Sequence, residues 1–311
     1  MTNYLILGGS GFIGSNLARF LVTCGHCPRI YTRSSSSLVN ITDILDYVDV
    51  VYGDFMDDVI VEKALDNIDV VFHLISTTFP QNTLESSVYD INSNLIPTIR
   101  LVEMCLIKGV KKIVYASSGG TVYGEPTEIP IKENHHLMPN SIYGQSKLTI
   151  ENYLNFYARS TSLEVNILRI SNPFGPRQKI LGVQGLISVA MGCCFYRRPI
   201  KIFNKGEAVR DYLYIDDVVR ALKIGAEISG SSIVNISSGF GYSIMEVIQL
   251  VEEVTQCTME KIFVSARQGD VNVNILSNEL ARQKYGWVPQ VDFKEGLSHT
   301  WDFILEHSAK Q

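Results

Sequence analysis

The sequence has little cysteine and no long apolar run. It holds 6 Cys among 311 residues. So few thiols do not form a disulfide scaffold, and they favour a reducing, cytoplasmic location. The apolar N-terminus, MTNYLILGGSGFIGS, lacks a basic segment and is interrupted early by glycines. We therefore expect neither a signal peptide nor a membrane span.

The sequence also lacks a run of Lys and Arg residues. Its 27 basic and 32 acidic side chains give a formal net charge of −5. Without a basic patch, neither a nucleic acid nor an anionic membrane is an expected partner. A small-molecule ligand is more compatible with this ordinary globular composition.

No metal site is expected either. Cys24 and Cys27 form a C-x-x-C pattern, CGHC, which occurs in redox pairs and in zinc sites. A redox pair places its first Cys at the N-terminus of a helix, whereas this pair follows an expected helix and precedes an expected strand. No second Cys/His pair with metal spacing follows it.

Short apolar runs alternate with amphipathic stretches through the first half of the chain. The expected strands are 4–9, 28–33, 49–54, 70–76, 111–118 and 165–172, and the expected helices are 12–25, 57–68, 91–109 and 141–160. This alternation predicts an α/β fold with a doubly wound parallel sheet of the Rossmann type, covered on both faces. Ligands of such sheets bind at the carboxyl ends of the strands.

The pattern changes near Asn172, where a segment rich in Gly and Pro begins. Residues 1–172 are expected to form a dinucleotide-binding domain. Residues 173–311 are expected to form a smaller, interleaved α/β substrate-binding region that exchanges segments with the first domain.

Three glycines, Gly8, Gly11 and Gly14, follow the first expected strand and open the first expected helix. Glycine permits a tight turn and lets backbone amides and the helix N-terminus approach a pyrophosphate. Glycines also mark ordinary turns, but in this position the spacing predicts dinucleotide binding.

The second expected strand ends in Thr32, Arg33 and four serines, without an acidic residue. An acid at this point binds the ribose 2′-hydroxyl of NAD, whereas Arg accommodates the 2′-phosphate of NADP. Arg33 with Ser34 or Ser35 therefore favours NADP; the alternative is a polar surface loop and NAD. Asp54, after the third strand, is placed to accept a hydrogen bond from the adenine amino group, or else it caps a helix.

Tyr143 and Lys147 are four residues apart in SIYGQSK and share a face of the expected helix. An ammonium close to a phenol favours the phenolate and lowers the pKa of the tyrosine toward neutrality. The pair predicts a general acid/base for a sugar hydroxyl or a carbonyl. Its spacing is common in helices, but the glycine turn and the strand end SSGGTVYG, which precede it in this order, make it specific.

Together these motifs resemble the extended short-chain dehydrogenase/reductase family, of the NAD-dependent epimerase/dehydratase type, and within it the nucleotide-sugar 4-epimerases. The resemblance covers nearly the whole chain and rests on GGSGFIGSNL, YGD, VFHL, SSGGTVYG, YGQSK, LRISNPFGPRQ, VRDYLYIDDV and RQGDV. It implies an enzyme that epimerises a UDP-hexose or UDP-N-acetylhexosamine by transient oxidation at C4, with a tightly bound nicotinamide cofactor. It also implies a homodimer joined by two helices of each subunit, including the one that bears Tyr143; its apolar Leu154 and Phe156 could equally belong to the core.

The resemblance assigns roles to single residues. Tyr143 is the acid/base, and Lys147 contacts the nicotinamide ribose and tunes the tyrosine. The implied cofactor-side residues include Gly8, Gly11, Phe12, Ile13, Gly14, Phe55, Leu74 and Asn94, the last of which could instead cap a helix. The implied substrate-side residues are Asn172, Gln184, Phe203, Arg210, Arg267 and Asp270, in which the two arginines match those for the diphosphate.

One position departs from the family pattern. Gly119 stands where many members carry the Ser or Thr that bridges the tyrosine and the sugar 4-oxygen. Ser118 is adjacent, but neighbouring side chains on a strand face opposite sides. Thr121 lies where the backbone has turned, so we expect the catalytic hydroxyl from Thr121 first and from Ser118 second.

Residues 118–120, Ser-Gly-Gly, hold no carboxylate, which the related 4,6-dehydratases need to eliminate water. Two alternatives to an epimerase stay open. One is an NADPH-dependent nucleotide-sugar 4-ketoreductase, which Arg33 favours, and the other is a cofactor-binding protein without catalysis. Asn274 aligns with a position that governs the room for a 2-acetamido group, so N-acetylated hexosamines are expected beside hexoses.

Overall fold

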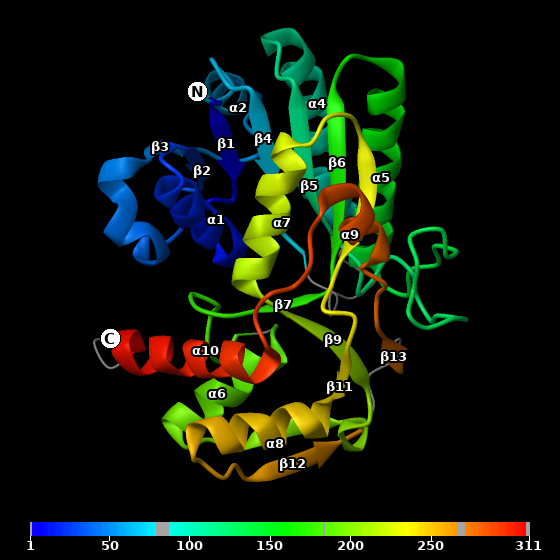
Figure 1. Cartoon of the computed structure of the whole chain (residues 1–311). Coiled ribbons are helices and arrows are strands. Elements are labelled where there is room, and N and C mark those ends of the chain that lie inside the picture. Colours follow the sequence, from blue (N-terminus) through cyan, green and yellow to red (C-terminus); the bar gives the residue numbers. More distant parts are fainter. Residues whose placement is uncertain (1, 79–86, 183, 266–270, 309–311) are drawn as a thin grey trace.

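A seven-stranded parallel sheet forms the centre of the protein (Figure 1). The structure is a computed structural model that describes residues 2–78, 87–182, 184–265 and 271–308. The strands lie in the order β10-β6-β5-β4-β1-β2-β3. Their bounds are Tyr4–Leu7 for β1, Arg29–Thr32 for β2, Asp49–Tyr52 for β3, Val70–His73 for β4, Lys112–Ser118 for β5, Glu164–Ile170 for β6 and Ser232–Ile236 for β10. This order confirms the doubly wound, Rossmann-type sheet.

Alternate residues of each strand fill two separate cores, one on each face of the sheet. Tyr4 and Ile6 of β1 belong to one core, and Leu5 and Leu7 to the other. Helices α1 (Phe12–Thr23) and α7 (Ile215–Glu227) contribute to the first core, whereas α2 (Asp58–Ala64), α4 (Ile96–Lys108) and α5 (Ile142–Ser160) contribute to the second. A strand that is buried on both faces needs apolar residues at successive positions, which explains the continuous apolar runs.

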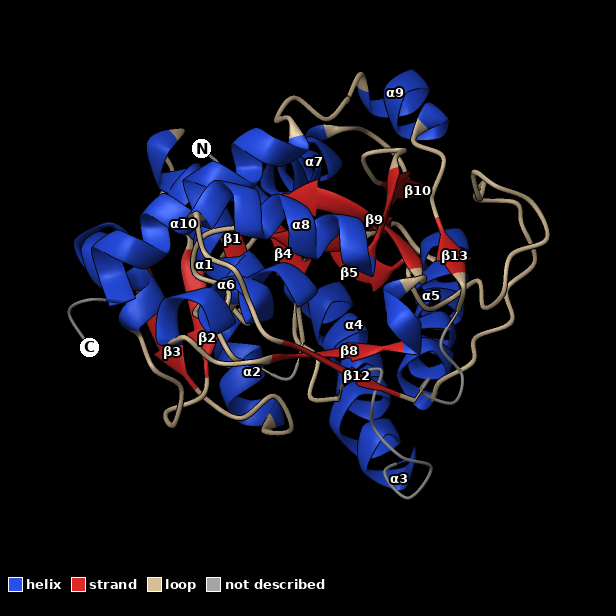
Figure 2. Ribbon diagram, turned by 90° about the horizontal axis from the view of Figure 1, so that it is seen from below, coloured by secondary structure: helices blue, strands red, loops and turns tan. Residues whose placement is uncertain are grey.

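The second half of the chain forms a smaller body below the carboxyl ends of these strands (Figure 1). Its helices are α6 (Leu186–Tyr196), α8 (Ile244–Thr255) and α10 (Phe293–Ser308). Its strands are β7 (Asn172–Phe174), β8 (Ile200–Phe203), β9 (Val209–Tyr214), β11 (Gly241–Ser243), β12 (Lys261–Val264) and β13 (Val273–Asn274). β9 pairs with β7, β11 and β13, and β8 pairs separately with β12 (Figure 2).

Three of the described elements beyond residue 172 belong to the upper body, and one of them, α9 (Glu279–Tyr285), packs against the other two, α7 and β10 (Figure 1). β10 pairs in parallel with β6 at the edge of the large sheet, and α7 packs against α1. The chain thus returns to the first body after it has begun the second. A division at residue 172 stays a prediction about the domains.

The helical segment that we expected to begin at residue 91 begins earlier. It starts with α3 (Ser87–Asp90) and continues through a π-helical turn, η3 (Ile91–Leu95), into α4. Gly109, with φ of +73°, ends α4 in the left-handed conformation that favours glycine. Single π-turns within helices often accompany functional sites, and this one carries Asn94. In the described ranges there are also two 3-10 helices, η1 (Val39–Tyr47) and η4 (Asn204–Gly206).

Candidate active site

The end of β5 and the first turns of α5 bring the expected acid/base residues together. The hydroxyl of Ser141 caps α5 by accepting from the amide of Gly144 over 3.1 Å. One turn later, the Nζ atom of Lys147 lies 5.7 Å from the centroid of the Tyr143 ring. Lys147 is buried, and its Nζ atom donates to the carbonyl oxygen of Ala116 on β5 over 2.9 Å. This bond fixes the ammonium beside the phenol.

The hydroxyl that contacts Tyr143 is that of Ser118, the last residue of β5. Thr121 donates instead to the carbonyl oxygen of Ser118 over 3.4 Å. This reverses the order that we expected, and the catalytic role of Ser118 stays a prediction. Both serines at the end of β5 reach the same helix, α5: Ser117 bonds to Glu151, and Ser118 bonds to Tyr143.

Packing explains why residue 119 is glycine. A Cβ atom at Gly119 would collide with the Cδ1 atom of Leu276 and lie 3.1 Å from the carbonyl oxygen of Arg169. Leu276 is fully buried, so it has little freedom to move aside. A side chain at this position would therefore point toward Leu276, and the nearby Ser118 supplies a hydroxyl instead.

Loss of hydration governs the protonation of the two groups. It raises the pKa of Tyr143 to about 12, although the hydrogen bond from Ser118 lowers it. The expected shift of this pKa toward neutrality is therefore wrong for the protein alone, because burial and, to a smaller extent, the charge of Asp90 both raise it. Burial also lowers the pKa of Lys147 to about 8, against the carboxylates of Glu151 and Asp90. At pH 7 Lys147 is mostly charged and Tyr143 holds its proton.

The glycine-rich turn after β1 can approach an anion closely. Gly8 adopts φ of +84°, which favours glycine. A Cβ atom at Gly14 would collide with the carbonyl oxygen of Gly8 and lie 2.7 Å from the Cα atom of Gly9. Gly11 precedes α1, whose first residues are Phe12 and Ile13, and no side chain caps this helix. Its N-terminus is therefore suited to a phosphate group.

The end of β2 holds a hydroxyl pair where an acid is common. Thr32 is buried and forms a hydrogen bond of 2.6 Å with Ser10 in the glycine-rich turn. Arg33 and Ser34 follow it and are exposed. The structure thus leaves both side chains accessible to a cofactor and decides neither NAD nor NADP.

Asp54 does not cap a helix. Its Oδ1 atom accepts from the amide of Met56 over 2.9 Å, and the residue is exposed. Asp57 is the cap of α2, so the alternative explanation for Asp54 is wrong. A role of Asp54 toward adenine stays a prediction.

The other cofactor-side residues lie after β3, after β4 and in the π-helical turn. Phe55 is buried, and its ring centroid is 5.2 Å from that of His73. Leu74 directly follows β4, and its amide donates to the carbonyl oxygen of Leu7 over 3.1 Å. The Oδ1 atom of Asn94 accepts from the amide of Thr77 over 3.0 Å. Asn94 is therefore held inside the π-helical turn and is not a helix cap.

Three substrate-side residues lie on the adjoining strands β7, β9 and β13. The Nδ2 atom of Asn172 donates to the carbonyl oxygen of Asp211 over 2.9 Å. Arg210 on β9 lies opposite Asn274 on β13. Asn274 is buried, and its Nδ2 atom donates to the carbonyl oxygen of Gly119 over 3.2 Å. The lower body thus reaches the strand end that bears Ser118.

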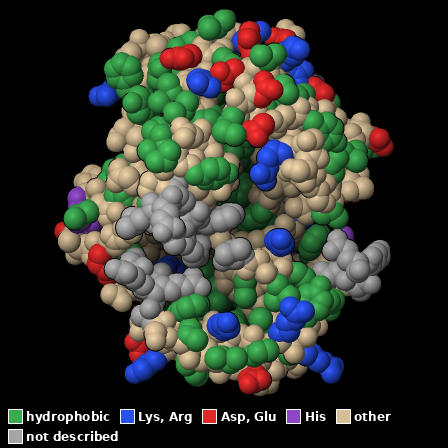
Figure 3. All heavy atoms as spheres, turned by 180° about the vertical axis from the view of Figure 1, so that it is seen from behind, with side chains coloured by type: hydrophobic (Ala, Val, Ile, Leu, Met, Phe, Trp, Pro, Cys, Tyr) green, Lys and Arg blue, Asp and Glu red, His purple; other side chains and the backbone are tan. Residues whose placement is uncertain are grey.

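Of the remaining substrate-side residues, the two that the structure describes lie in the lower body. Gln184 is exposed directly before α6, and Phe203 is the last residue of β8. Arg267 and Asp270 lie outside the described residues. Seen from behind, the surface is hollowed at the waist between the two bodies, and basic side chains lie beside the hollow (Figure 3). This waist is where the carboxyl ends of the strands meet the lower body.

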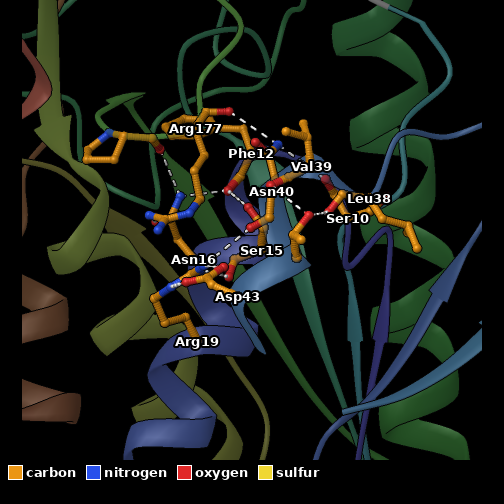
Figure 4. Close-up of polar contacts among 12 residues, drawn as sticks. Ser10, Phe12, Ser15, Asn16, Arg19, Leu38, Val39, Asn40, Asp43 and Arg177 are labelled. Atoms are coloured by element: carbon orange, nitrogen blue, oxygen red, sulfur yellow. Dashed lines mark hydrogen bonds and ion pairs between the residues drawn. The ribbon is translucent and has the colours of Figure 1, made fainter. Parts of the chain in front are cut away.

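Polar contacts join the cofactor end to the loop after β7 (Figure 4). The Nδ2 atom of Asn16 on α1 donates to the carbonyl oxygen of Pro176 over 3.0 Å. In return, Nη1 of Arg177 donates to the Oδ1 atom of Asn16 over 3.3 Å. The Nδ2 atom of Asn40 donates to the carbonyl oxygens of Ser10, at 3.3 Å, and Arg177, at 3.4 Å. These contacts fix the glycine-rich turn relative to the lower body.

Sequence reasoning missed a buried ion pair behind the strand end. Glu151 on α5 and Arg169 on β6 are joined by Nη2–Oε2 and Nε–Oε2 contacts of 2.7 and 3.1 Å. Both side chains are almost fully buried, at 1% and 3% exposure. The signal was present: an arginine in an apolar strand needs a buried anion, and Glu151 shares a helix face with Lys147.

The expectations about thiols, metals and membranes concern the rest of the molecule. Cys24 follows α1 directly, and both it and Cys27 are exposed free thiols. Among the described residues there is no group of three His, Cys, Asp or Glu side chains that could hold a metal ion. Within the same ranges, no helix combines the length and apolar character that crossing a bilayer requires.

A family model and curated relatives match this arrangement. The model described as the NAD-dependent epimerase/dehydratase family matches residues 4–237. A UDP-glucose 4-epimerase of Mycolicibacterium smegmatis is 32% identical over 309 residues, which cover 98% of this chain and 99% of that protein. A dTDP-4-dehydro-6-deoxyglucose reductase of Escherichia coli is 32% identical over 304 residues, 94% of each chain.

Solved structures match the fold over almost its whole length. A UDP-glucose 4-epimerase of Thermotoga maritima, solved with UDP-glucose, superposes with a TM-score of 0.92 at 32% identity and covers 98% of this chain and 99% of its own. A UDP-glucose 4-epimerase of Thermus thermophilus, solved with NAD, gives a TM-score of 0.91 at 30% identity and covers 98% of this chain and 100% of its own.

Proposed function

Because the chain belongs to the NAD-dependent epimerase/dehydratase family, we propose that it is a nucleotide-sugar 4-epimerase. The proposed substrate is a UDP-hexose or a UDP-N-acetylhexosamine, inverted at C4 by transient oxidation. Relatives named UDP-glucose 4-epimerase that match over nearly the full length support this choice. Such an enzyme needs a nicotinamide cofactor but does not consume it, because the oxidation at C4 is reversed in the same reaction.

One observation carries the proposal: an acid/base pair stands at a strand end that holds no carboxylate. Tyr143 contacts the hydroxyl of Ser118 and lies beside the ammonium of Lys147. The two residues that follow Ser118 are glycines. Elimination of water from a sugar needs an additional acid and base, whereas oxidation and reduction at one carbon need a single proton exchange. The arrangement therefore favours redox chemistry at C4 over dehydration.

The three side chains divide the proton chemistry among them. Tyr143 acts as a phenolate, a form that burial disfavours in the protein alone and that the charge of Lys147 favours. The phenolate takes the proton of the sugar 4-hydroxyl as C4 is oxidised, and it returns this proton when the 4-ketone is reduced on the opposite face. Ser118 orients the phenol and the sugar 4-oxygen by hydrogen bonds. Lys147 stabilises the phenolate by its charge. When bound, a nicotinamide cofactor supplies hydride acceptance and hydride return at C4.

The residues around the glycine-rich turn fit such a cofactor. The turn excludes a Cβ atom at Gly14, and no side chain occupies the N-terminus of α1. A pyrophosphate would be held there by backbone amides. Leu74 follows β4, the neighbour of β1, Phe55 follows β3, and Asn94 is bonded to Thr77 after β4. These three residues would lie along the rest of the cofactor.

The identity of the cofactor at the ribose 2′ position is a separate proposal. Arg33 and Ser34 are exposed at the end of β2, and no acid is present there, which supports NADP. The solved epimerase of Thermus thermophilus, however, was crystallised with NAD. Titration of the apo protein with both cofactors tests the proposal. Equal affinities, or tighter binding of NAD, would contradict a preference for NADP.

The substrate diphosphate would be bound by arginines of the lower body, Arg210 and Arg267. Arg210 lies on β9 beside Asn172 and Asn274, close to the strand end. A guanidinium suits a diphosphate because it presents several donors in one plane. Gln184, Phe203 and Asp270 would contact the nucleoside. Asn274 would leave room for a 2-acetamido group, so both hexose and N-acetylhexosamine substrates are proposed.

A 4-ketoreductase is the second candidate, favoured by the relative named dTDP-4-dehydro-6-deoxyglucose reductase. One experiment separates the two functions. The purified protein is incubated with UDP-galactose or UDP-N-acetylgalactosamine without added reduced cofactor, and the products are resolved by chromatography. Appearance of the C4 epimer supports the epimerase. A parallel incubation holds a nucleotide 4-keto sugar and NADPH. Turnover in this incubation alone, with stoichiometric loss of NADPH, would replace the epimerase by the reductase, and no turnover in either incubation would favour a non-catalytic protein.

A homodimer is also proposed. Leu154 on α5 is buried and belongs to the core, but Phe156 and Tyr153 on the same helix are 55% and 43% exposed. Ile107 on the neighbouring α4 is 79% exposed. Large apolar side chains on two adjacent helices are compatible with a helical interface between subunits. Light scattering coupled to gel filtration tests this: a mass of one chain at micromolar concentration would contradict it.

A further inference from the structure

Asp90, at the end of α3, is a buried carboxylate, and one of its two oxygens has no hydrogen-bond partner among the described residues. Its residue exposure is 0%. The Oδ1 atom accepts from the hydroxyl of Thr78 and from Nδ2 of Asn94, the latter over 3.1 Å. The Oδ2 atom is buried and has no hydrogen-bond partner among the described residues. A buried anion is strongly unfavourable unless a cation or further donors compensate it.

The carboxylate faces the acid/base pair. Asp90 lines a small cavity of about 10 Å³ between α3, the π-helical turn and α5. Tyr143, Lys147, Ser146 and Asn94 line the same cavity. Since Asn94 occupies the other oxygen of Asp90, the free oxygen is the part of this carboxylate that remains available to the groups on α5.

The buried cations and carboxylates behind the strand end indicate which positive charge Asp90 compensates. Two cations are buried behind the strand end, Lys147 and Arg169, and two carboxylates, Asp90 and Glu151. Arg169 and Glu151 neutralise each other through their forked contact. Lys147 and Asp90 remain. Both carboxylates raise the pKa of Lys147, that of Glu151 more than that of Asp90, but Glu151 is already paired with Arg169, whereas Asp90 forms no ion pair among the described residues.

The remaining groups that face Lys147 carry no charge at neutral pH. They are Tyr143 on its own helix, Tyr115 on β5, whose ring centroid is 4.7 Å from Nζ, and His73 on β4. Burial raises the pKa of Tyr115 well above its ordinary value. Burial, together with the charge of Lys147, lowers the pKa of His73 to about 3. Neither side chain can replace a carboxylate as the partner of the ammonium.

We propose that Asp90 is a positioning residue that supplies the counter-charge of Lys147 and so keeps the ammonium protonated beside Tyr143. This rests on the proposed function only in that Tyr143 and Lys147 perform the proton transfer. Through Asn94, the same carboxylate also links this charge to the cofactor side. Asp90 itself does not touch the reacting sugar.

The test replaces Asp90 by its uncharged isostere. Asp90→Asn keeps an oxygen for the donor group of Asn94 but removes the charge. We expect the pKa of Lys147 to fall by roughly one unit or more. A one-unit fall from about 8 removes about four fifths of the ammonium at pH 8 but little at pH 6. Epimerisation should therefore decrease about fivefold more at pH 8 than at pH 6.

The matched controls separate charge from structure. Asp58→Asn removes the same charge from an exposed ion pair with Arg100, so its pH profile should follow that of the wild type. Asp90→Glu restores the charge. The pH at which epimerisation falls in alkaline solution should therefore rise again toward that of the wild type. A loss in Asp90→Asn that is equal at pH 6 and pH 8 would show a structural role through Asn94 and would overturn the proposal.

A second readout does not depend on turnover. The ¹³Cε signal of Lys147 is followed against pH in lysine-labelled protein, and it is assigned by its loss in Lys147→Arg. A lower titration midpoint in Asp90→Asn supports the counter-charge, and an unchanged midpoint contradicts it. If the wild type fails to epimerise any nucleotide sugar, the proposed function fails, but this titration still decides the role of Asp90.

Discussion

The buried pair of Glu151 and Arg169 makes the most quantitative prediction about the fold. The change is Glu151→Gln, which keeps the shape of the side chain and removes its charge. Arg169 would then remain 3% exposed without its anion, and Ser117 would lose a charged acceptor. Loss of one partner of a buried ion pair destabilises proteins by about 3–5 kcal/mol. Because Gln still offers one oxygen to the guanidinium, we expect the lower end, about 3 kcal/mol.

Urea unfolding, followed by circular dichroism, measures this loss. With a slope of about 3 kcal/mol per molar urea, the midpoint should fall by about 1 M. Glu227→Gln is the matched control, because Glu227 pairs with Lys223 one turn away on α7 but is 57% exposed. Its loss should stay below about 0.5 kcal/mol. Equal losses of unfolding free energy in the two variants would refute the claim that the ion pair of Glu151 stabilises the fold because it is buried.

Three further predictions concern the site. Ser118→Ala should reduce epimerisation by a larger factor than Thr121→Val, because Ser118 contacts Tyr143; the reverse order in kcat would restore the expectation from sequence. Gly14→Ala should lower the cofactor content of the purified protein, since the new Cβ would lie 2.7 Å from the Cα atom of Gly9; full occupancy, measured by absorbance after denaturation, would contradict this. The activity of the wild type should fall as pH rises through about 8, because the pKa of Lys147 is depressed to that value and the ammonium is complete only below it; a profile that stays flat to pH 10 would exclude this group.

The fold could be predicted because its strands are buried on both faces. Continuous apolar runs, such as 70–72 and 113–116, leave few alternatives to a covered parallel sheet. The Tyr143 and Lys147 pair could be predicted because both lie on one helix, where spacing determines the face. Gly8 and Gly14 could be interpreted because their position between strand and helix fixes their task.

The rest depended on contacts between segments far apart in the chain. The contact of Ser118 with Tyr143 depends on how β5 is placed against α5, which no local spacing shows. Gly119 is explained by Leu276, which follows it by more than a hundred residues. Asp90 and Arg169 are charged residues on separate elements, and no local spacing showed which partner each would find.

The transfer of hydrogen at C4 tests the central claim most directly. UDP-galactose that carries deuterium at C4 is incubated with the purified protein in ordinary water, and the UDP-glucose formed is analysed by NMR and mass spectrometry. Transient oxidation with return of the same hydride predicts that deuterium is retained at C4 of the product. Complete loss of the label to solvent would contradict hydride transfer. If protein saturated with cofactor formed no UDP-glucose and also left UDP-N-acetylgalactosamine unchanged, the proposed epimerase would be contradicted.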